Sequence, residues 1–258
     1  MDCISLFRGY TGLCELKGKG EKNMNKWFYV LFISLAISSP LLASTNIENF
    51  EENTYTPKKQ TPPKGWDKGN EKDGKIDYYV VKESKNTFLR AKTILGTKGK
   101  IIRLNKKFDI KKTPYLSWNW RVLKFPNMSK EKGQEEADNA ATVYVAFKDK
   151  YVIKYDWSQR NCKAVGKKSA FFKSKSSGSV HIFIKPLRCT NPKIACCNDK
   201  VGVWTTEKVN LIADFKKIYK EVKWTPELIE GIGILTDGDD TKTEGVSADY
   251  DNFTLSSK

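Results

Sequence analysis

Three carboxylates stand close together in the segment Asp237-Gly-Asp-Asp-Thr241, and carboxylates at such spacing can bind a divalent cation. The EF-hand pattern fails, because Lys242 stands where its glycine should be and Ala248 where its glutamate should be. A simpler loop holding a structural calcium ion is one interpretation, and a solvated acidic turn is the other. The candidate metal ligands are Asp237, Asp239, Asp240 and Asp249.

Paired carboxylates can also act as acid and base in glycoside hydrolysis when they lie about 5 to 10 Å apart. Asp138 follows Glu135 and Glu136 and precedes a strand-like segment, and it is the candidate to face Asp237, Asp239 or Glu207. Solvated loop carboxylates are the commoner case. His181 is the only histidine and lies in a strand-like run, which gives a Ser-His-Asp or Cys-His mechanism little support. No nucleophile-elbow, Walker or dinucleotide glycine pattern is present.

Aromatic side chains offer a third chemistry, because a flat ring can stack on a sugar. The segment Leu116-Ser-Trp-Asn-Trp-Arg-Val122 alternates strictly as a strand and puts Trp118 and Trp120 on one face with two aliphatic side chains. Aliphatic neighbours on the same face favour burial of both tryptophans over an exposed surface for stacking on a sugar. Asn119 and Arg121 lie on the opposite face and are the better candidates for ligand contact.

Tyr155 and Trp157 alternate with Ile153 in the same way in a later segment. They belong to the core, or they line a concave face with Asp156 at its rim. The candidate ligand-binding residues are Asn119, Arg121, Asp138, Tyr155 and Trp157.

The elements that position these residues are short strands separated by turn residues, as in an all-β sandwich or barrel. One segment, Glu207 to Tyr219, has apolar residues at helical spacing, with Thr205 or Thr206 as its N-cap, and predicts one short helix at about 207–220. The expected strands are Ile76–Val81, Thr87–Lys92, Lys100–Leu104, Tyr115–Val122, Ala141–Phe147, Tyr151–Trp157, Val180–Ile184, Gly231–Leu235 and Ala248–Leu255. Lys167 to Ser179 is expected to be a loop.

Export is predicted from Met24 onward. Asn25 and Lys26 form a short positive region, an apolar run follows from Trp27 to Ile37, and cleavage is expected near Ala43. The apolar run is too short for a membrane span, so the mature chain is expected to be periplasmic or secreted with no transmembrane segment. We expect residues 1–23 to be an upstream extension and 24–43 a signal peptide. Residues 44–65 should be an irregular segment, and 66–258 a single domain.

Four cysteines in the mature chain predict disulfides in an oxidising compartment: Cys162, Cys189, Cys196 and Cys197. A bridge between the adjacent Cys196 and Cys197 would be strained, which leaves Cys162 paired with one of them and Cys189 with the other. A zinc site is the weaker alternative, because the spacing lacks a Cys-x-x-Cys pair.

The chain carries a formal net charge of +16, from 46 basic and 30 acidic residues. The basic residues are 40 lysines and only 6 arginines, and arginine is the residue that makes bidentate phosphate and base contacts. This ratio argues against a specific nucleic-acid reader. It is typical of a solvated lysine-rich surface, with weak binding to an anionic envelope polymer as an alternative.

Several motifs follow one another in order: Leu116-Ser-Trp-Asn-Trp-Arg-Val, Asp138-Asn-Ala-Ala, Ile153-Lys-Tyr-Asp-Trp, Gly231-Ile-Gly-Ile-Leu-Thr-Asp-Gly-Asp-Asp-Thr and Ala248-Asp-Tyr-Asp-Asn-Phe. The set resembles the bacterial secreted family named domain of unknown function 3047, over most of Trp66 to Leu255. The family usually carries a second aspartate where this chain has Asn139, and the cysteine-bearing segment Lys185 to Lys200 looks like a local elaboration. The resemblance implies a jelly-roll sandwich similar to carbohydrate-binding modules, and it implies no established activity.

The sequence therefore predicts a mainly β protein, a jelly-roll or galactose-binding-like β-sandwich with one short helix. The leading functional hypothesis is an exported, non-catalytic protein that binds a glycan or another envelope component. One alternative is a carbohydrate-active hydrolase or lyase that uses paired carboxylates. Another is a structural or adhesive envelope protein. No cofactor is predicted beyond the calcium alternative.

Overall fold

A computed structural model describes residues 44–53, 63–68, 76–94, 102–126, 138–158, 171–173, 180–186, 201–239 and 241–258, all within one compact unit from Leu41 to Lys258. Several predictions lie outside the described residues: the extension 1–23, the signal peptide 24–43, the four cysteines and Asp240. In the part of the chain that is described, no helix is both long and apolar enough to span a membrane.

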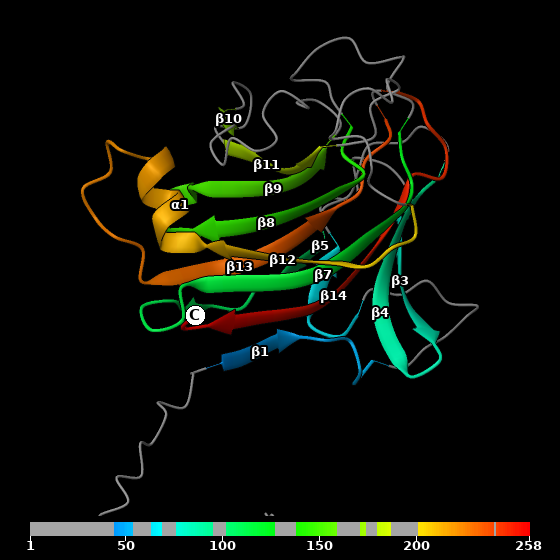
Figure 1. The fold of residues 1–258 in the computed structure, drawn as a ribbon, viewed down its shortest axis with the longest axis horizontal. Helices are drawn as coiled ribbons and strands as arrows, with labels where there is room; N and C mark the ends of the chain where they lie inside the picture. The colour runs from blue at the N-terminus through cyan, green and yellow to red at the C-terminus, as the bar shows by residue number, and fades with distance from the viewer. Residues whose placement is uncertain are drawn as a thin grey trace, which may run out of the picture. The chain divides into compact units, whose positions relative to one another are not determined.

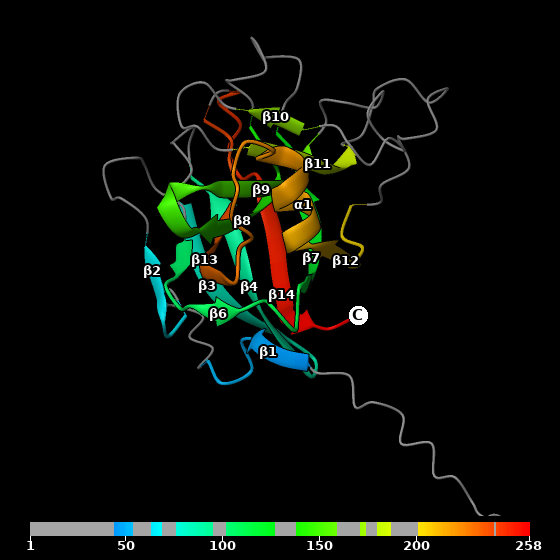
Figure 2. The same ribbon diagram turned by 90° about the vertical axis from the view of Figure 1, so that its left-hand side faces the viewer.

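The described strands form two sheets packed face to face (Figures 1 and 2). The first sheet has the order β12-β7-β14-β4-β3, and β1 pairs with β14. Its strands are β1 (Ser44–Glu48), β3 (Ile76–Glu83), β4 (Asn86–Thr93), β7 (Tyr115–Lys124), β12 (Thr205–Asn210) and β14 (Ser247–Ser256). Its described pairings are all antiparallel, which suits a sheet with one face on the core and one toward solvent.

The second sheet has the order β10-β11-β9-β8-β13-β5-β2, and β6 pairs with β13. Its strands are β2 (Trp66–Lys68), β5 (Ile102–Leu104), β6 (Phe108–Asp109), β8 (Ala141–Phe147), β9 (Val152–Ser158), β10 (Phe171–Lys173), β11 (Val180–Pro186) and β13 (Leu228–Leu235). β9 and β11 run parallel, while the other described pairs in this sheet are antiparallel. The two sheets confirm the predicted mainly β sandwich.

The core between the sheets is built on the alternation of β7. Trp118 and Trp120 are both completely buried, and Asn119 between them and Arg121 after them point to the other face, as predicted. From the facing sheet, Tyr155 packs on Trp118 with ring centroids 5.6 Å apart, and Trp157 packs on Trp120 at 5.3 Å. Tilted ring pairs at these distances add to the area burial that dominates the stability of such a core.

The predicted helix is α1 (Leu211–Ile218), and it is shorter than the expected 207–220. Its N-cap is Asn210, whose side chain accepts a hydrogen bond from the Ala213 N–H at 2.9 Å. Thr205 and Thr206, the expected caps, lie instead in β12, which pairs residue by residue with β7. The strand ladder thus continues to Asn210 and moves the start of the helix to Leu211.

Short strands without an apolar alternation are the other departures from the prediction. Ser44–Glu48 lies in the segment expected to be irregular, yet it pairs with the end of β14 as β1. Phe171–Lys173 forms β10 inside the expected lysine- and serine-rich loop. Because these strands are edge additions to a sheet already built, their pairing depends on the partner strand rather than on their own pattern.

Candidate functional site

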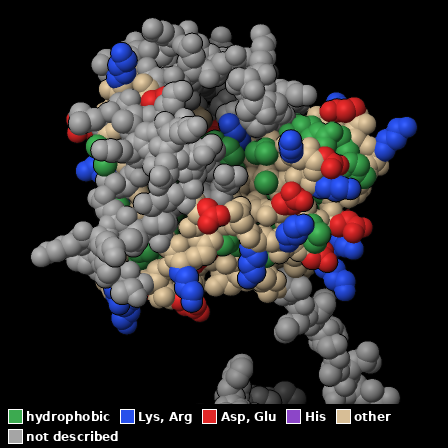
Figure 3. Space-filling view, turned by 180° about the vertical axis from the view of Figure 1, so that it is seen from behind, with side chains coloured by type: hydrophobic (Ala, Val, Ile, Leu, Met, Phe, Trp, Pro, Cys, Tyr) green, Lys and Arg blue, Asp and Glu red, His purple; other side chains and the backbone are tan. Residues whose placement is uncertain are grey.

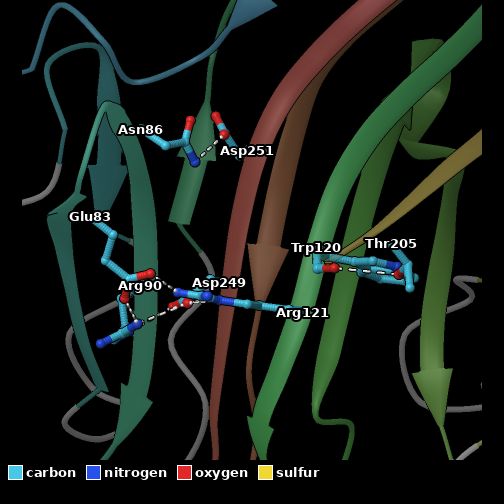
Figure 4. A network of polar contacts seen from close by, with 8 residues as sticks. All are labelled: Glu83, Asn86, Arg90, Trp120, Arg121, Thr205, Asp249 and Asp251. Carbon is cyan, nitrogen blue, oxygen red and sulfur yellow. Dashed lines mark hydrogen bonds and ion pairs between the residues drawn. The ribbon is translucent and has the colours of Figure 1, made fainter. Parts of the chain in front are cut away.

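A balanced array of charges lies on the outer face of the first sheet, in which β4, β14 and β7 are neighbours (Figure 4). Asp249 is fully buried and accepts from Arg90 Nε at 2.7 Å and from Arg121 Nε at 2.6 Å. The second nitrogen of each arginine, Nη2, donates to Glu83, at 3.3 Å for Arg90 and 2.8 Å for Arg121. We call Glu83, Arg90, Arg121 and Asp249 the arginine array.

Two aromatic rings that contact each other, with centroids 5.3 Å apart, pack against the arginine array at Arg121. The guanidinium carbon of Arg121 lies 4.9 Å from the centre of the Phe88 ring and 4.7 Å from that of Trp204. Such cation–π contacts immobilise the guanidinium, and the carboxylates already accept its hydrogen bonds. Arg121, a predicted ligand contact, thus has its Nε and Nη2 donors engaged within the protein. Its predicted companion Asn119 lies on the same face, and its Oδ1 accepts from Thr206 at 2.8 Å.

The burial of Tyr155 and Trp157 corrects the prediction that these two side chains contact a ligand. Their exposed fractions are 0% and 1%, and both rings point into the core between the sheets. The hydroxyl of Tyr155 donates to Asp214 on α1 at 3.0 Å, and burial raises the pKa of this hydroxyl well above its ordinary value. The alternation with Ile153 is therefore the signature of a core strand, and neither ring offers a stacking surface.

A second group of charges consists of like charges. Asp138, Asp237 and Asp239 each bring a carboxylate oxygen to within 4.8 Å of those of the other two. We call these three residues the acidic cluster. The structure thus unites two predicted metal ligands with the predicted ligand contact Asp138. Asp249 is not among them, because it lies in the arginine array.

Hydrogen bonds from the following loop hold the acidic cluster in place. Asp138 Oδ2 accepts from the Thr241 N–H at 2.8 Å and also from the Thr241 hydroxyl. Asp237 Oδ1 accepts from the Gly238 N–H at 2.8 Å, while its own N–H donates to the Asn139 carbonyl at 2.9 Å. A side chain at Gly238 would come within 2.6 Å of the Thr243 carbonyl, so only glycine fits this tight approach.

Polar side chains on the outer face of the second sheet lie beside the acidic cluster. On β8 and β9, the core-facing residues alternate with Thr142, Tyr144, Lys154 and Asp156, which are not part of the main core cluster. Thr142 Oγ1 donates to Asp156 at 2.6 Å, and the Lys154 ammonium lies 4.8 Å from the centre of the Tyr144 ring. We call these four residues, together with the acidic cluster, the polar site.

The ionisable groups of the polar site are desolvated by burial and interact with one another. Burial raises the pKa of Asp237 well above its usual value, and the neighbouring Asp239 and Asp138 raise it further. Burial lowers the pKa of Lys154, and the charges of Asp156 and Asp237 oppose this effect. Burial and the same two carboxylates raise the pKa of the Tyr144 hydroxyl. Such mutually perturbed groups mark a candidate functional site.

The polar site supports three kinds of chemistry. The three oxygens of the acidic cluster are the hard ligands that calcium prefers, and the adjacent Asn139 buries a side-chain oxygen that has no hydrogen-bond partner among the described residues. A carboxyl with a raised pKa beside another carboxylate can act as an acid. Carboxylates and an ammonium group on one sheet face can also bind hydroxyl groups of a ligand.

Lys154, Tyr144 and Thr142 were not identified from the sequence. The available signal was the same alternation that identified the core, because residues between core-facing positions must lie on the outer face. Whether polar side chains gather on an outer face depends on which strands are neighbours in the sheet. That neighbour relation places Tyr144 opposite Lys154 and Thr142 opposite Asp156.

Comparison with known proteins identifies the family. Residues 64–254 match the profile described as "Protein of unknown function (DUF3047)", and the chain belongs to this family. This match confirms the resemblance drawn from the ordered motifs. A search of curated proteins found no match.

Solved structures with a similar fold include carbohydrate-binding modules. A family 11 module of the cellulase Lic26A-Cel5E of Clostridium thermocellum matches with a TM-score of 0.39 and 8% identity, over 83% of this chain and 94% of that chain. The xyloglucanase domain of NopAA from Sinorhizobium fredii matches with a TM-score of 0.44 and 8% identity, over 80% of this chain and 100% of that chain. These similarities concern the β-sandwich alone.

Proposed function

We propose that this member of the DUF3047 family is an exported protein that binds a glycan at the polar site. One observation carries the proposal: Asp156 is fully buried and Lys154 largely so, on a sheet face turned away from the core. Desolvating such groups costs free energy even where they are hydrogen-bonded, as Asp156 is by Thr142, and desolvated charged groups with perturbed pKa values are concentrated at functional sites. Three members, Lys154, Asp237 and Asp239, remain partly exposed and can hydrogen-bond to the hydroxyl groups of a sugar.

Binding is favoured over catalysis because the carboxylates of the acidic cluster support their own loop. Asp138 holds Thr241, and Asp237 holds the Gly238 N–H, so both have an oxygen engaged in structure. A catalytic pair needs one carboxyl free to protonate a leaving group and another free to act as nucleophile or base. A rigid set of donors and acceptors suits recognition without requiring either step. The proposed export follows from the signal-peptide pattern at 24–43.

A direct test is binding to a panel of soluble polysaccharides by titration calorimetry. Lys154→Gln removes a charge from the polar site, and Lys82→Gln removes one from an exposed position on β3 as the matched control. We expect at least a tenfold loss of affinity for Lys154→Gln, equivalent to about 1.4 kcal/mol, and no change for Lys82→Gln. Equal affinities for both variants, or no binding to any polysaccharide, would contradict the proposal.

Glycoside hydrolysis is the second candidate, because the acidic cluster places carboxylates close together and raises the pKa of Asp237. It predicts release of reducing ends from a bound polysaccharide, lost in Asp237→Asn. The binding proposal predicts that the polysaccharide is recovered with unchanged length after prolonged incubation. Measuring chain length by size-exclusion chromatography separates the two functions on the same sample.

A further inference from the structure

Aromatic rings gather at the end of the sandwich where α1 lies. Phe147, Phe215 and Tyr219 are buried, with exposed fractions of 1%, 1% and 3%. Tyr151 and Trp224 pack on this buried layer and remain partly exposed. The Tyr151 ring lies 4.6 Å from Tyr219 and the Trp224 ring 5.0 Å from Phe215. We call Tyr151 and Trp224 the aromatic platform.

The aromatic platform is held rigidly. Its two rings lie 5.9 Å apart at 70°, an edge-to-face geometry. Tyr219, beneath Tyr151, anchors its hydroxyl on the Val152 carbonyl at 2.8 Å. A ring that is already fixed loses little conformational entropy when a ligand covers it.

The turn that carries Tyr151 is strained. Asp149 and Lys150 both have left-handed backbone angles, with φ of 59° and 63°, although neither is glycine. Two successive left-handed residues are the geometry of a type I′ hairpin turn, which costs about 1 kcal/mol or more per residue where neither is glycine. The strained turn closes the β8–β9 connection tightly, with the Phe147 N–H bonded to the Tyr151 carbonyl at 2.8 Å. It thereby sets the position of Tyr151 beside α1.

The charges around the aromatic platform are mixed. Seen from behind, hydrophobic side chains gather on the side of α1 with basic and acidic side chains among them (Figure 3). Exposed residues of both signs flank the rings in the chain: Lys148, Asp149, Lys150, Lys220, Glu221 and Lys223. Nearby, Lys111 pairs with Glu227 at 2.9 Å. The rim thus carries both ammonium and carboxylate groups, so an acidic polymer would meet negative as well as positive charges there.

We propose that the aromatic platform is a sugar-stacking site for an uncharged polysaccharide, separate from the polar site. The C–H faces of a pyranose ring are apolar, and they pack on the electron-rich face of an aromatic ring. The mixed charges at the rim serve hydroxyl groups equally well as donors and acceptors. This inference rests on the proposed function, and it adds the ligand class and a second contact surface.

The test compares two partly exposed tryptophans. Trp224→Leu keeps an apolar side chain over Phe215 but removes the flat ring face, and Trp204→Leu makes the same change beside the arginine array. Both variants are titrated with a soluble β-glucan, a mannan and a xylan, and with polygalacturonate as the carboxylated comparison. We expect Trp224→Leu to lose at least tenfold in affinity for a neutral polysaccharide, with Trp204→Leu unchanged. Thermal melts identify any variant that is unfolded.

Each outcome decides the inference separately from the proposed function. If Lys154→Gln loses binding and Trp224→Leu does not, the polar site stands and the platform is rejected. Tighter binding to polygalacturonate than to every neutral polymer also rejects it. If Trp224→Leu does not fold, Tyr151→Leu replaces it under the same criterion. If Trp224→Leu converts a dimer to a monomer in sedimentation, the platform is a self-association surface and the inference falls.

Discussion

The arginine array and the acidic cluster are both groups of buried or half-buried charges, yet they are built on opposite electrostatic plans. In the array, Asp249 is fully buried between two guanidinium groups, and Glu83 caps the other side. In the cluster, three carboxylates face one another and backbone N–H and hydroxyl donors hold them. The array is balanced internally and stabilises the first sheet. The cluster brings three carboxylates together and is the better candidate for binding.

The largest effect is expected in the array. Asp249→Ala leaves Arg90 and Arg121 without their shared buried partner, and it should lower the free energy of unfolding by about 3 to 5 kcal/mol. Urea denaturation measures the loss. Glu83→Gln is the control on the exposed side of the same array and should cost less than about 1 kcal/mol. Equal losses for the two variants would show that burial of Asp249 is not what matters.

The opposite sign is expected in the acidic cluster. Asp239→Asn removes a like charge beside Asp237 and should raise the free energy of unfolding at pH 7, because it relieves the repulsion between the two carboxylates. Differential scanning calorimetry in a chelator-containing buffer measures the gain. If Asp239→Asn is less stable than the parent protein only when calcium is added, the cluster is a cation site. Its carboxylates would then stabilise the calcium-bound protein, as the arginine array stabilises the first sheet.

The third prediction concerns Asp251, two residues beyond Asp249 on β14. Burial raises its pKa to about 6, against the lowering effect of hydrogen bonds from Asn86 and Asn252. The folded protein therefore holds this proton more tightly than the unfolded chain. The resulting stability is fully present below pH 4 and is lost as the pH rises through 6. Asp251 is buried, and one pKa unit corresponds to about 1.4 kcal/mol, so a rise from 3.8 to about 6 sets an upper limit of about 3 kcal/mol for the change.

The Asp251 effect is measured as the pH dependence of unfolding between pH 4 and 7. Asp251→Asn should flatten that part of the curve, because the amide does not titrate. A curve identical to that of the parent protein would mean that Asp251 titrates alike in the folded and the unfolded chain, which would contradict the prediction.

The fold followed from the sequence where the pattern was local. The alternation of Trp118 and Trp120 predicted β7 and its buried face, and the bounds of β8 were predicted without error. Asn210 was missed as the helix cap because β12 carries only Thr205–Asn210, a polar edge strand without a clear apolar period. A local pattern reports a strand when one face is buried in a core, and edge strands lack that condition.

The candidate site followed from the sequence only in part. Asp138 and Asp237 were identified as carboxylates able to work together, and they meet in the acidic cluster. Asp249 was grouped with them, yet it belongs to the arginine array on the other sheet. Sequence spacing does not record which side of a strand faces which neighbour, and the array needs Arg90, more than 150 residues away from Asp249 in the chain. Such a pairing depends on the strand order.

By itself the sequence determined the family, the sandwich class and the division of each long strand into a core face and an outer face. These follow from residue order and from the two-residue period of a strand. Only the tertiary structure decided which outer faces gather charge, because strand order brings β4, β14 and β7 together on one side and β8, β9 and the loop after β13 on the other. It also placed the aromatic platform at Tyr151 and Trp224, which lie 73 positions apart in the chain and meet only through the packing of α1.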